Sequence, residues 1–177
     1  SDLEIKPDET LNEVDIIIEI KEGRSGLINK ISFEGFTKEE ENDILSQIIT
    51  QKYNIFTSWA TGAGTYHEEG IEQDKYIITN NLQNRGYADA KVEISVKESK
   101  NSNRIGILIS AVKGSYYTLG KLTFENNTLF NDAAILSQFR VYQNAPYSPE
   151  LVRETVNNIS DMYGAKGYID AYVTYEP

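Results

Sequence analysis

The chain has 177 residues, of which 40% are hydrophobic, and its 17 basic and 27 acidic side chains give a net charge of −10. This length and hydrophobic content allow one large core or two small ones. The acidic excess argues against binding to a nucleic-acid backbone. With no cysteine and one histidine, the sequence excludes disulfides, thiolate chemistry and a multi-histidine metal site. We expect no cofactor and no bound metal.

The N-terminal part of the chain is expected to hold two strands and a helix. Residues 14–20 are mostly apolar, and residues 28–34 alternate apolar and polar side chains as a short strand does. Thr37 and Glu40 have the spacing of a capping box, which predicts the start of a helix. Apolar residues then recur at helical spacing.

A second helix and two further strands are expected to follow. Residues 71–84 carry an apolar stripe, and their helix is expected to end at Gly86, which tolerates a left-handed conformation. Strands are expected at 88–97 and 104–112, separated by a polar turn. Near the C-terminus, Ser148 precedes a proline and predicts the capped start of another helix.

The sequence contains an internal repeat. Residues 28–35 align with 119–126 at an offset of 91, and residues 44–47 recur identically at the same offset. Residues 85–92 begin Arg-Gly-Tyr-Ala-Asp and match residues 166–173, which begin Lys-Gly-Tyr-Ile-Asp. Repeats this long are typical of small α+β domains in tandem rather than of solenoid turns.

We therefore predict three pieces. Residues 1–23 are the C-terminal strand of a preceding domain, residues 24–114 are a complete domain, and residues 115–177 are a domain without its last strand. Each complete unit reads strand–helix–helix–strand–strand, so that three strands bury one face under two helices. The glycines of the short linkers are expected to allow bending between units.

This order of motifs resembles the POTRA domain. The resemblance rests on Glu22-Gly23 and Lys113-Gly114, on Ile28, Ile31, Phe33 and Gly35, and on Gly86-Tyr87 with Gly167-Tyr168. It covers nearly the whole chain and departs at Asn126, where a POTRA unit usually has glycine; asparagine also tolerates positive φ. The resemblance implies a mixed sheet with the third strand at the centre and the first and second at the edges.

POTRA domains occur in tandem at the periplasmic end of BamA-type outer-membrane assembly factors and in related translocation pores. The resemblance thus implies a non-enzymatic periplasmic scaffold, with a C-terminal membrane β-barrel in the full-length chain. The pieces would be the end of the first, all of the second and most of the third POTRA domain. Implied partners are unfolded outer-membrane proteins and assembly-machinery lipoproteins or periplasmic chaperones. A two-partner secretion pore, or another polypeptide-translocating pore, is the alternative within this class.

The second strand of each unit is the candidate binding site. An edge strand exposes unpaired N–H and C=O groups onto which another chain can add as a strand. The candidate residues are Ala88, Ala90, Val92, Ile94, Val96, Ile169, Ala171 and Val173. A second candidate surface is the aromatic loop with Phe56, Trp59 and Tyr66, which either contacts clients or folds back over the helices.

Other chemistry is weakly supported. An acid-dependent hydrolase would use Asp89 or Glu93 with another carboxylate, but Asp89 and its counterpart Asp170 are expected in separate domains. The Gly62-Ala63-Gly64 run lacks the Gly-Lys-Ser/Thr of a phosphate-binding loop and predicts a turn. We predict no catalytic residue. A last hypothesis is strand exchange, in which residues 14–20 of one copy complete the C-terminal domain of another.

Overall fold

The computed structural model describes residues 3–8, 13–18, 26–56, 58–99, 102–139 and 144–175. Its elements in chain order are β1 (Leu3–Asp8), β2 (Glu13–Ile18), β3 (Leu27–Glu34), α1 (Lys38–Gln47), α2 (Ser58–Thr61), α3 (Glu68–Asn84), β4 (Lys91–Glu98), β5 (Arg104–Val112), α4 (Asp132–Leu136) and α5 (Pro149–Gly164). None of the helices described is both long and apolar enough to cross a membrane. We call residues 26–112 the middle unit and residues 115–175 the C-terminal unit.

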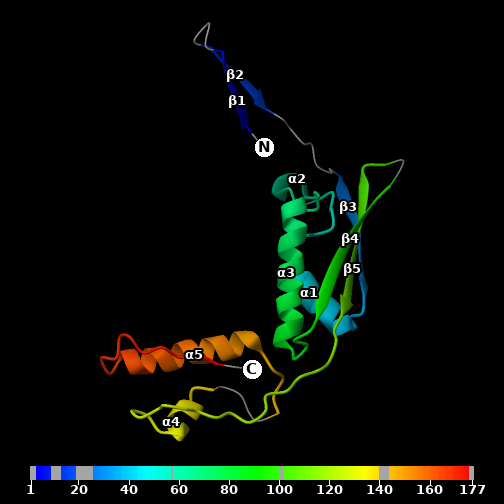
Figure 1. Ribbon diagram of the computed structural model, residues 1–177. Coiled ribbons are helices and arrows are strands. Elements are labelled where there is room, and N and C mark those ends of the chain that lie inside the picture. The colour runs from blue at the N-terminus through cyan, green and yellow to red at the C-terminus, as the bar shows by residue number, and fades with distance from the viewer. Residues whose placement is uncertain are drawn as a thin grey trace.

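The middle unit is a three-stranded mixed sheet in the order β3-β5-β4. The central strand β5 runs parallel to β3 and antiparallel to β4. Figure 1 shows the helices α1 and α3 along one face of this sheet. Since β3 and β5 are parallel, the chain must cross over between them, and α1, α3 and β4 lie in that connection. The expected α+β fold is confirmed, including the third strand of the unit at its centre.

The core lies between the sheet and the two helices. Every second residue of β5 points into it because side chains alternate between the faces of a strand. Burying such a side chain contributes about 1.5–3 kcal/mol relative to leaving it exposed. The most deeply buried apolar residues are Ile28, Ile44, Ile78, Leu82, Ile105, Ile107 and Ile109.

Both predicted helix starts are present. The Thr37 hydroxyl accepts a hydrogen bond from Glu40 N at 3.3 Å, and the Glu40 carboxylate accepts one from Thr37 N at 2.7 Å. This reciprocal pair is the capping box, and it satisfies two backbone donors that have no partner within the helix. At the start of α5, the Ser148 hydroxyl accepts a hydrogen bond from Leu151 N at 3.2 Å.

A buried aspartate joins the end of α1 to the middle of α3. The two carboxylate oxygens of Asp74 accept hydrogen bonds from Ile49 N at 2.6 Å and Thr50 N at 2.9 Å. Asp74 is only 1% exposed. These two N–H groups follow the last turn of α1, so Asp74 fixes where the loop leaves that helix. No motif in the sequence points to this role of Asp74.

The N-terminal strands form a hairpin whose register repeats that of β4 and β5. Leu3 pairs with Ile18, and 91 residues later Ile94 pairs with Ile109. The same correspondence continues along the ladder. The strand expected at 14–20 is β2, as far as residue 18; residues 19 and 20 lie outside the described ranges. The strand β1, which contains a proline and two acidic residues, was not predicted.

The C-terminal unit has its helices but not its expected strands. Residues 119–125 and 171–175 form no ladder. In the middle unit, β3 and β4 each pair with β5 and not with one another. Among the described residues no strand pairs with either segment in the way that β5 joins β3 and β4. The helix α5 forms because its backbone hydrogen bonds are internal.

Candidate functional site

The strand β4 forms one edge of the sheet of the middle unit. It pairs with β5 on one side, and no other strand among the described residues pairs with it. Its outward-facing residues on the uncovered face of the sheet are exposed, whereas the alternate residues face the helices. The outward-facing residues are Lys91, Glu93, Ser95 and Lys97. Charged side chains of this kind discourage indiscriminate pairing at an edge.

The backbone groups that β4 directs at its open side can be identified from the hairpin. Ser99 N donates to Arg104 O at 3.0 Å, in the register of the β4–β5 ladder. Successive residues of a strand direct their backbone groups to opposite sides, so the odd-numbered residues of β4 bond to β5. The even-numbered residues Val92, Ile94 and Val96 therefore direct N–H and C=O at the open edge.

The side chains of these three residues point toward the core and the helices, not toward the open edge of the sheet. Val92 is buried in the core, and Ile94 and Val96 pack against it while remaining partly exposed. A segment that docks at this edge would thus meet their backbone rather than their side chains. Such a contact takes its energy from main-chain hydrogen bonds, which every residue except proline can supply.

Two of the predicted edge residues lie outside the strand. β4 begins at Lys91, and Ala88 lies in the turn that precedes it. Ala90 is buried, and its N–H bonds to Tyr87 O at 2.9 Å within that turn. The strand expected at 88–97 therefore begins three residues before β4 does. The reason is that the apolar alternation continues back into the turn.

The edge predicted for the C-terminal unit is not formed. Ile169 is 86% exposed, and Ala171 and Val173 are half-buried. None of the three belongs to a strand. In the middle unit the corresponding strand β4 pairs with β5, and no strand among the described residues pairs with this segment.

The opposite edge of the sheet is partly covered by the loop between α1 and α3. Ile28 of β3 donates from its N–H to Gly64 O and accepts at its C=O from Tyr53 N, both at 2.8 Å. Gly64 has φ +84° and lies directly against the Tyr53 backbone. The loop thus occupies the backbone groups of Ile28, and β4 remains the less obstructed edge in the described part of the chain.

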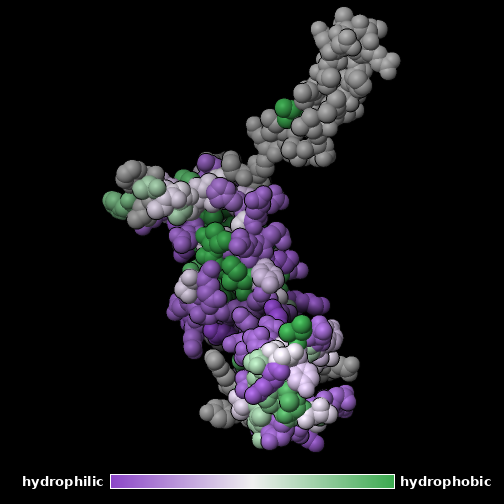
Figure 2. Space-filling model, turned by 90° about the vertical axis from the view of Figure 1, so that its left-hand side faces the viewer, coloured by the Kyte–Doolittle hydropathy of each residue, from purple (hydrophilic) through white to green (hydrophobic). Residues whose placement is uncertain are grey.

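The aromatic loop is divided between surface and core. Phe56 is 84% exposed, and in Figure 2 hydrophobic atoms project from this end of the mostly hydrophilic middle unit. Tyr66, by contrast, is 7% exposed and belongs to the core, so its ring is not a surface contact. Trp59 lies in α2, and its side chain is outside the described part of the structure.

The remaining candidates are the two carboxylates considered for hydrolysis, the Gly62–Gly64 run and a metal site. Asp89 accepts a hydrogen bond from the Tyr117 hydroxyl at 2.6 Å, and Glu93 is exposed on the uncovered sheet face. The hydrogen bond to Asp89 raises the pKa of Tyr117 above its ordinary value of 10.0. Gly64 is part of a tight loop contact rather than a phosphate cradle. Among the described residues, no cluster of three or more acidic, histidine or cysteine side chains is placed to hold a metal ion.

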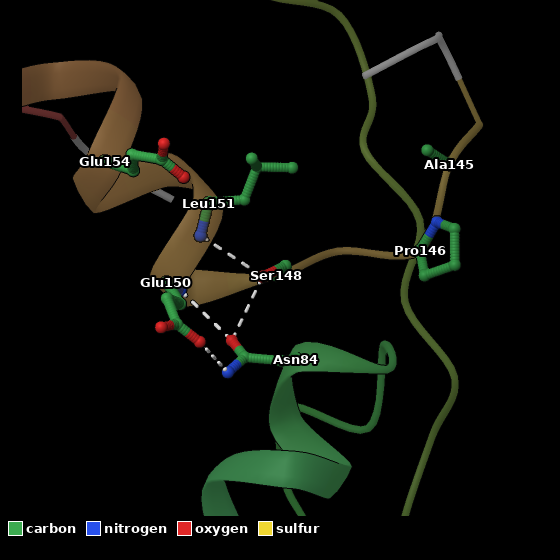
Figure 3. Close-up of a pocket in the computed structure, with 7 residues that line it drawn as sticks. All are labelled: Asn84, Ala145, Pro146, Ser148, Glu150, Leu151 and Glu154. Carbon is green, nitrogen blue, oxygen red and sulfur yellow. Dashed lines mark hydrogen bonds between the residues drawn. The ribbon is translucent and has the colours of Figure 1, made fainter. Parts of the chain in front are cut away.

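The junction between the units is built around Asn84, the last residue of α3. Figure 3 shows its side chain directed at the start of α5. Its amide oxygen accepts from the Ser148 hydroxyl at 3.0 Å and from Glu150 N at 3.1 Å, and its amide nitrogen donates to the Glu150 carboxylate at 2.7 Å. Asn84 thus caps the helix of the next unit. These residues line a shallow pocket of about 370 Å³.

The linker is also fastened to the middle unit. Tyr117 N donates to Gly86 O at 2.7 Å, and Tyr147 N donates to Tyr117 O at 3.0 Å. The expected bending at glycine is therefore opposed by hydrogen bonds on both sides of the linker. No sequence pattern singled out Asn84 or Tyr117, although the recurring Gly-Tyr-x-Asp motif is a signal that points to this junction.

A partly buried ion pair supports the same end of the middle unit. Lys113 Nζ lies 2.7 Å from the Glu40 carboxylate and 5.2 Å from the centre of the Tyr87 ring. Burial by itself raises the pKa of Glu40. The hydrogen bonds from Lys113 and from Thr37 N outweigh burial, so the pKa of Glu40 lies below its ordinary value of 4.5.

We expect Glu40→Gln to lower the free energy of unfolding by about 1–2 kcal/mol at neutral pH, because it removes a hydrogen-bonded charge pair. A carboxyl with a lowered folded pKa contributes stability that is complete above pH 4.5 and is lost as the pH falls through the folded value. The difference between variant and unchanged chain should therefore shrink below pH 4.5. Urea unfolding at pH 7 and at about pH 3.5 tests this; a difference that stays constant would contradict it.

These features define a class of protein: tandem α+β units that share a Gly-Tyr turn after the long helix, the middle unit having its third strand at the centre of a mixed sheet. A family model for POTRA, described as surface antigen variable number repeat, matches residues 27–114 and 117–177. The chain belongs to the POTRA family.

Relatives and solved structures agree with this assignment. The chain is 26% identical over 168 residues to the outer membrane protein assembly factor BamA of Neisseria meningitidis, a match that covers 94% of this chain and 21% of the relative. It is 25% identical over 162 residues to a putative outer membrane protein assembly factor of Treponema pallidum, covering 89% of this chain and 19% of the relative. The chain thus spans about a fifth of the length of these relatives.

The fold is similar to that of solved POTRA domains. The structure of POTRA3-5 of Haemophilus influenzae BamA matches 97% of this chain and 62% of that chain, with a TM-score of 0.57 and 19% identity. BamA of Haemophilus ducreyi lacking POTRA domains 1-3 matches 76% of this chain and 24% of that chain, with a TM-score of 0.58.

Proposed function

We propose that the chain is a periplasmic, non-enzymatic scaffold of an outer-membrane β-barrel assembly factor. In this role it binds unfolded outer-membrane proteins, which add as a strand to β4. Assembly-machinery lipoproteins or periplasmic chaperones dock on the same array, and a membrane β-barrel completes the full-length protein. The relatives named as assembly factors support the class of function. The observation that carries the binding mode is the open edge of β4, with the backbone groups of Val92, Ile94 and Val96 directed outward.

We also propose the division of the chain. Residues 1–23 end one POTRA domain, residues 24–114 form the next, and residues 115–177 begin a third. The hairpin β1–β2 supports the first boundary, because its register matches that of β4–β5 at the offset of the repeat. Residues 1–23 then hold two strands of the preceding domain rather than one.

Edge docking predicts protection of particular backbone amides. A peptide from an outer-membrane β-strand should slow hydrogen exchange at Ile94 N and Val96 N about tenfold once most of the chain carries peptide. The amides of Glu93 and Ser95 already bond to β5 and serve as internal references. Exchange followed by NMR, with and without peptide, measures both sets in one sample.

The control is the same peptide N-methylated at consecutive residues, so that neither side of its strand can donate backbone hydrogen bonds to a strand edge. It should give no protection at Ile94 or Val96. Equal protection by the two peptides would exclude strand addition. Protection confined to the loop around Phe56 would assign client binding to that loop instead.

A further inference from the structure

The uncovered face of β4 carries a charge pattern that reverses about Ser95. Its outward-facing side chains are, in chain order, Lys91, Glu93, Ser95 and Lys97, and all of them are exposed. The ion pairs in the described part of the chain involve none of these side chains. A two-fold axis through Ser95 exchanges the position of the Glu93 carboxylate with that of the Lys97 ammonium group. The face of this edge is therefore complementary to itself.

The backbone of β4 limits how a second copy of the chain can pair with it. A two-fold axis perpendicular to the sheet places the second β4 antiparallel to the first, so that one sheet runs through both copies. The residues that direct N–H and C=O at the open edge are the even-numbered Val92, Ile94 and Val96. In an antiparallel ladder such residues must lie opposite one another. The axis must therefore pass through a residue and not between two residues.

Charge opposes two of the registers that remain. With the axis at Glu93, the two Glu93 carboxylates lie directly opposite each other. With the axis at Ile94, Lys91 lies opposite Lys97 of the second copy. Like charges directly across a ladder are destabilising. An axis nearer to either end of β4, which spans Lys91–Glu98, pairs a shorter part of the strand.

With the axis at Ser95, opposite charges face each other on both sides of it. Glu93 of each copy lies opposite Lys97 of the other, at positions that are not hydrogen-bonded and where opposing Cα atoms are about 4.5 Å apart. The small Ser95 side chains meet at the axis. On the helix side, Ile94 lies opposite Val96 of the second copy. Both residues are partly exposed in the single chain, so pairing covers apolar surface as well.

We propose that two copies of the chain pair through β4 about Ser95, and that this pairing closes the edge to clients. The backbone groups of Ile94 and Val96 then bond to the second copy instead of a client strand. The competition with clients rests on the proposed function, whereas the pairing needs only the open edge. Because the contact is small, we expect a dissociation constant of about 0.1–1 mM.

The test uses the 177-residue chain without any peptide. Sedimentation equilibrium from about 10 µM to about 2 mM should show a monomer–dimer equilibrium in the stated range of affinity. Hydrogen exchange at Ile94 N and Val96 N should slow about twofold at the concentration where half the chains are paired, because only the unpaired edge exchanges. The amides of Glu93 and Ser95 already bond to β5 and should not change. A chain that stays monomeric throughout would overturn the proposal.

Charge reversal tests the register. Glu93→Lys and Lys97→Glu each place like charges opposite one another twice, so each should weaken pairing at least about tenfold. The double variant restores opposite charges and should pair within about twofold of the unchanged chain. Glu93→Lys also reduces the net charge of −10, so general repulsion between chains predicts tighter association for it. Unchanged or tighter pairing of Glu93→Lys would overturn the proposal.

Lys91→Glu is the matched control on the same face of β4. In the Ser95 register its side chain lies beyond the charged pairs, so pairing should change by less than about twofold. With the axis at Ile94 the same substitution would place opposite charges across the ladder. Tighter pairing of Lys91→Glu would therefore contradict the Ser95 register.

The pairing and the client function can fail separately. A chain that stays monomeric but whose Ile94 and Val96 amides are protected by a client peptide overturns the pairing alone. A chain that pairs as expected but gains no protection from peptide at low chain concentration contradicts client binding alone. Where both occur, peptide should dissociate the dimer. A dimer that persists when peptide saturates the edge would overturn the competition.

Discussion

Replacing Gly64 with alanine is expected to lower the free energy of unfolding of the middle unit by about 3–5 kcal/mol. A side chain at φ +84° costs about 1–2 kcal/mol, and the new Cβ would collide with the backbone N and Cα of Tyr53. Relieving that collision breaks the hydrogen bonds of Ile28 with Gly64 and Tyr53, each of which contributes about 1 kcal/mol. Urea unfolding followed by circular dichroism measures the loss.

Gly62→Ala is the matched control. Gly62 lies two residues away with φ +70°, and a Cβ there would meet nothing within 4 Å. It should therefore lose only about 1–2 kcal/mol, the cost of the left-handed conformation. Equal losses for the two variants would mean that the contact with Tyr53 does not hold the loop on the edge of β3.

The second large effect is expected for Asp74→Ala, with a loss of about 3–5 kcal/mol. The change removes both acceptors of Ile49 N and Thr50 N, and the hydrogen bond to Thr50 N is buried. A hydrogen bond to a charged group contributes about 1.5–3 kcal/mol, and a buried donor left without a partner adds its desolvation cost. Unfolding by urea at neutral pH gives the loss directly.

Two further variants make the Asp74 test specific. Asp74→Asn keeps one acceptor oxygen and should fall between alanine and the unchanged chain. Glu72→Ala removes an exposed carboxylate from the same helix and should change stability by less than about 0.5 kcal/mol. If Asp74→Ala were as mild as Glu72→Ala, the link between α1 and α3 would not depend on the buried carboxylate.

The two edges of the sheet differ in how open they are to the addition of another strand. At β3, the loop carrying Gly64 bonds to Ile28 and blocks strand addition at the start of that edge. At β4, charged residues project from one face while the backbone of alternate residues stays open. The charged side chains oppose unspecific aggregation at this edge. The open backbone groups can still pair with an added strand whose side chains are compatible with the exposed residues of β4. This asymmetry favours β4 as the docking edge in the proposed scaffold.

Local signals determined much of the architecture. Capping residues at Thr37 and Ser148 predicted two helix starts, since a cap depends on residues three positions apart. Alternation predicted the strands of the middle unit because a sheet with one buried face imposes a period of two. The internal repeat then extended both predictions along the chain and, through the resemblance, placed the third strand at the centre of the sheet.

Contacts between distant segments decided the rest. The sequence by itself determined where helices begin, which strand faces are apolar and that the units repeat. Only the tertiary structure decided that Asp74 receives the loop after α1, that Tyr117 docks on Gly86 and Asp89, and that residues 119–125 and 171–175 form no sheet. The physical reason is that a cap or an amphipathic period is satisfied within a few residues. A buried acceptor, a docking turn or a strand acquires its role from a partner that lies far away in the sequence.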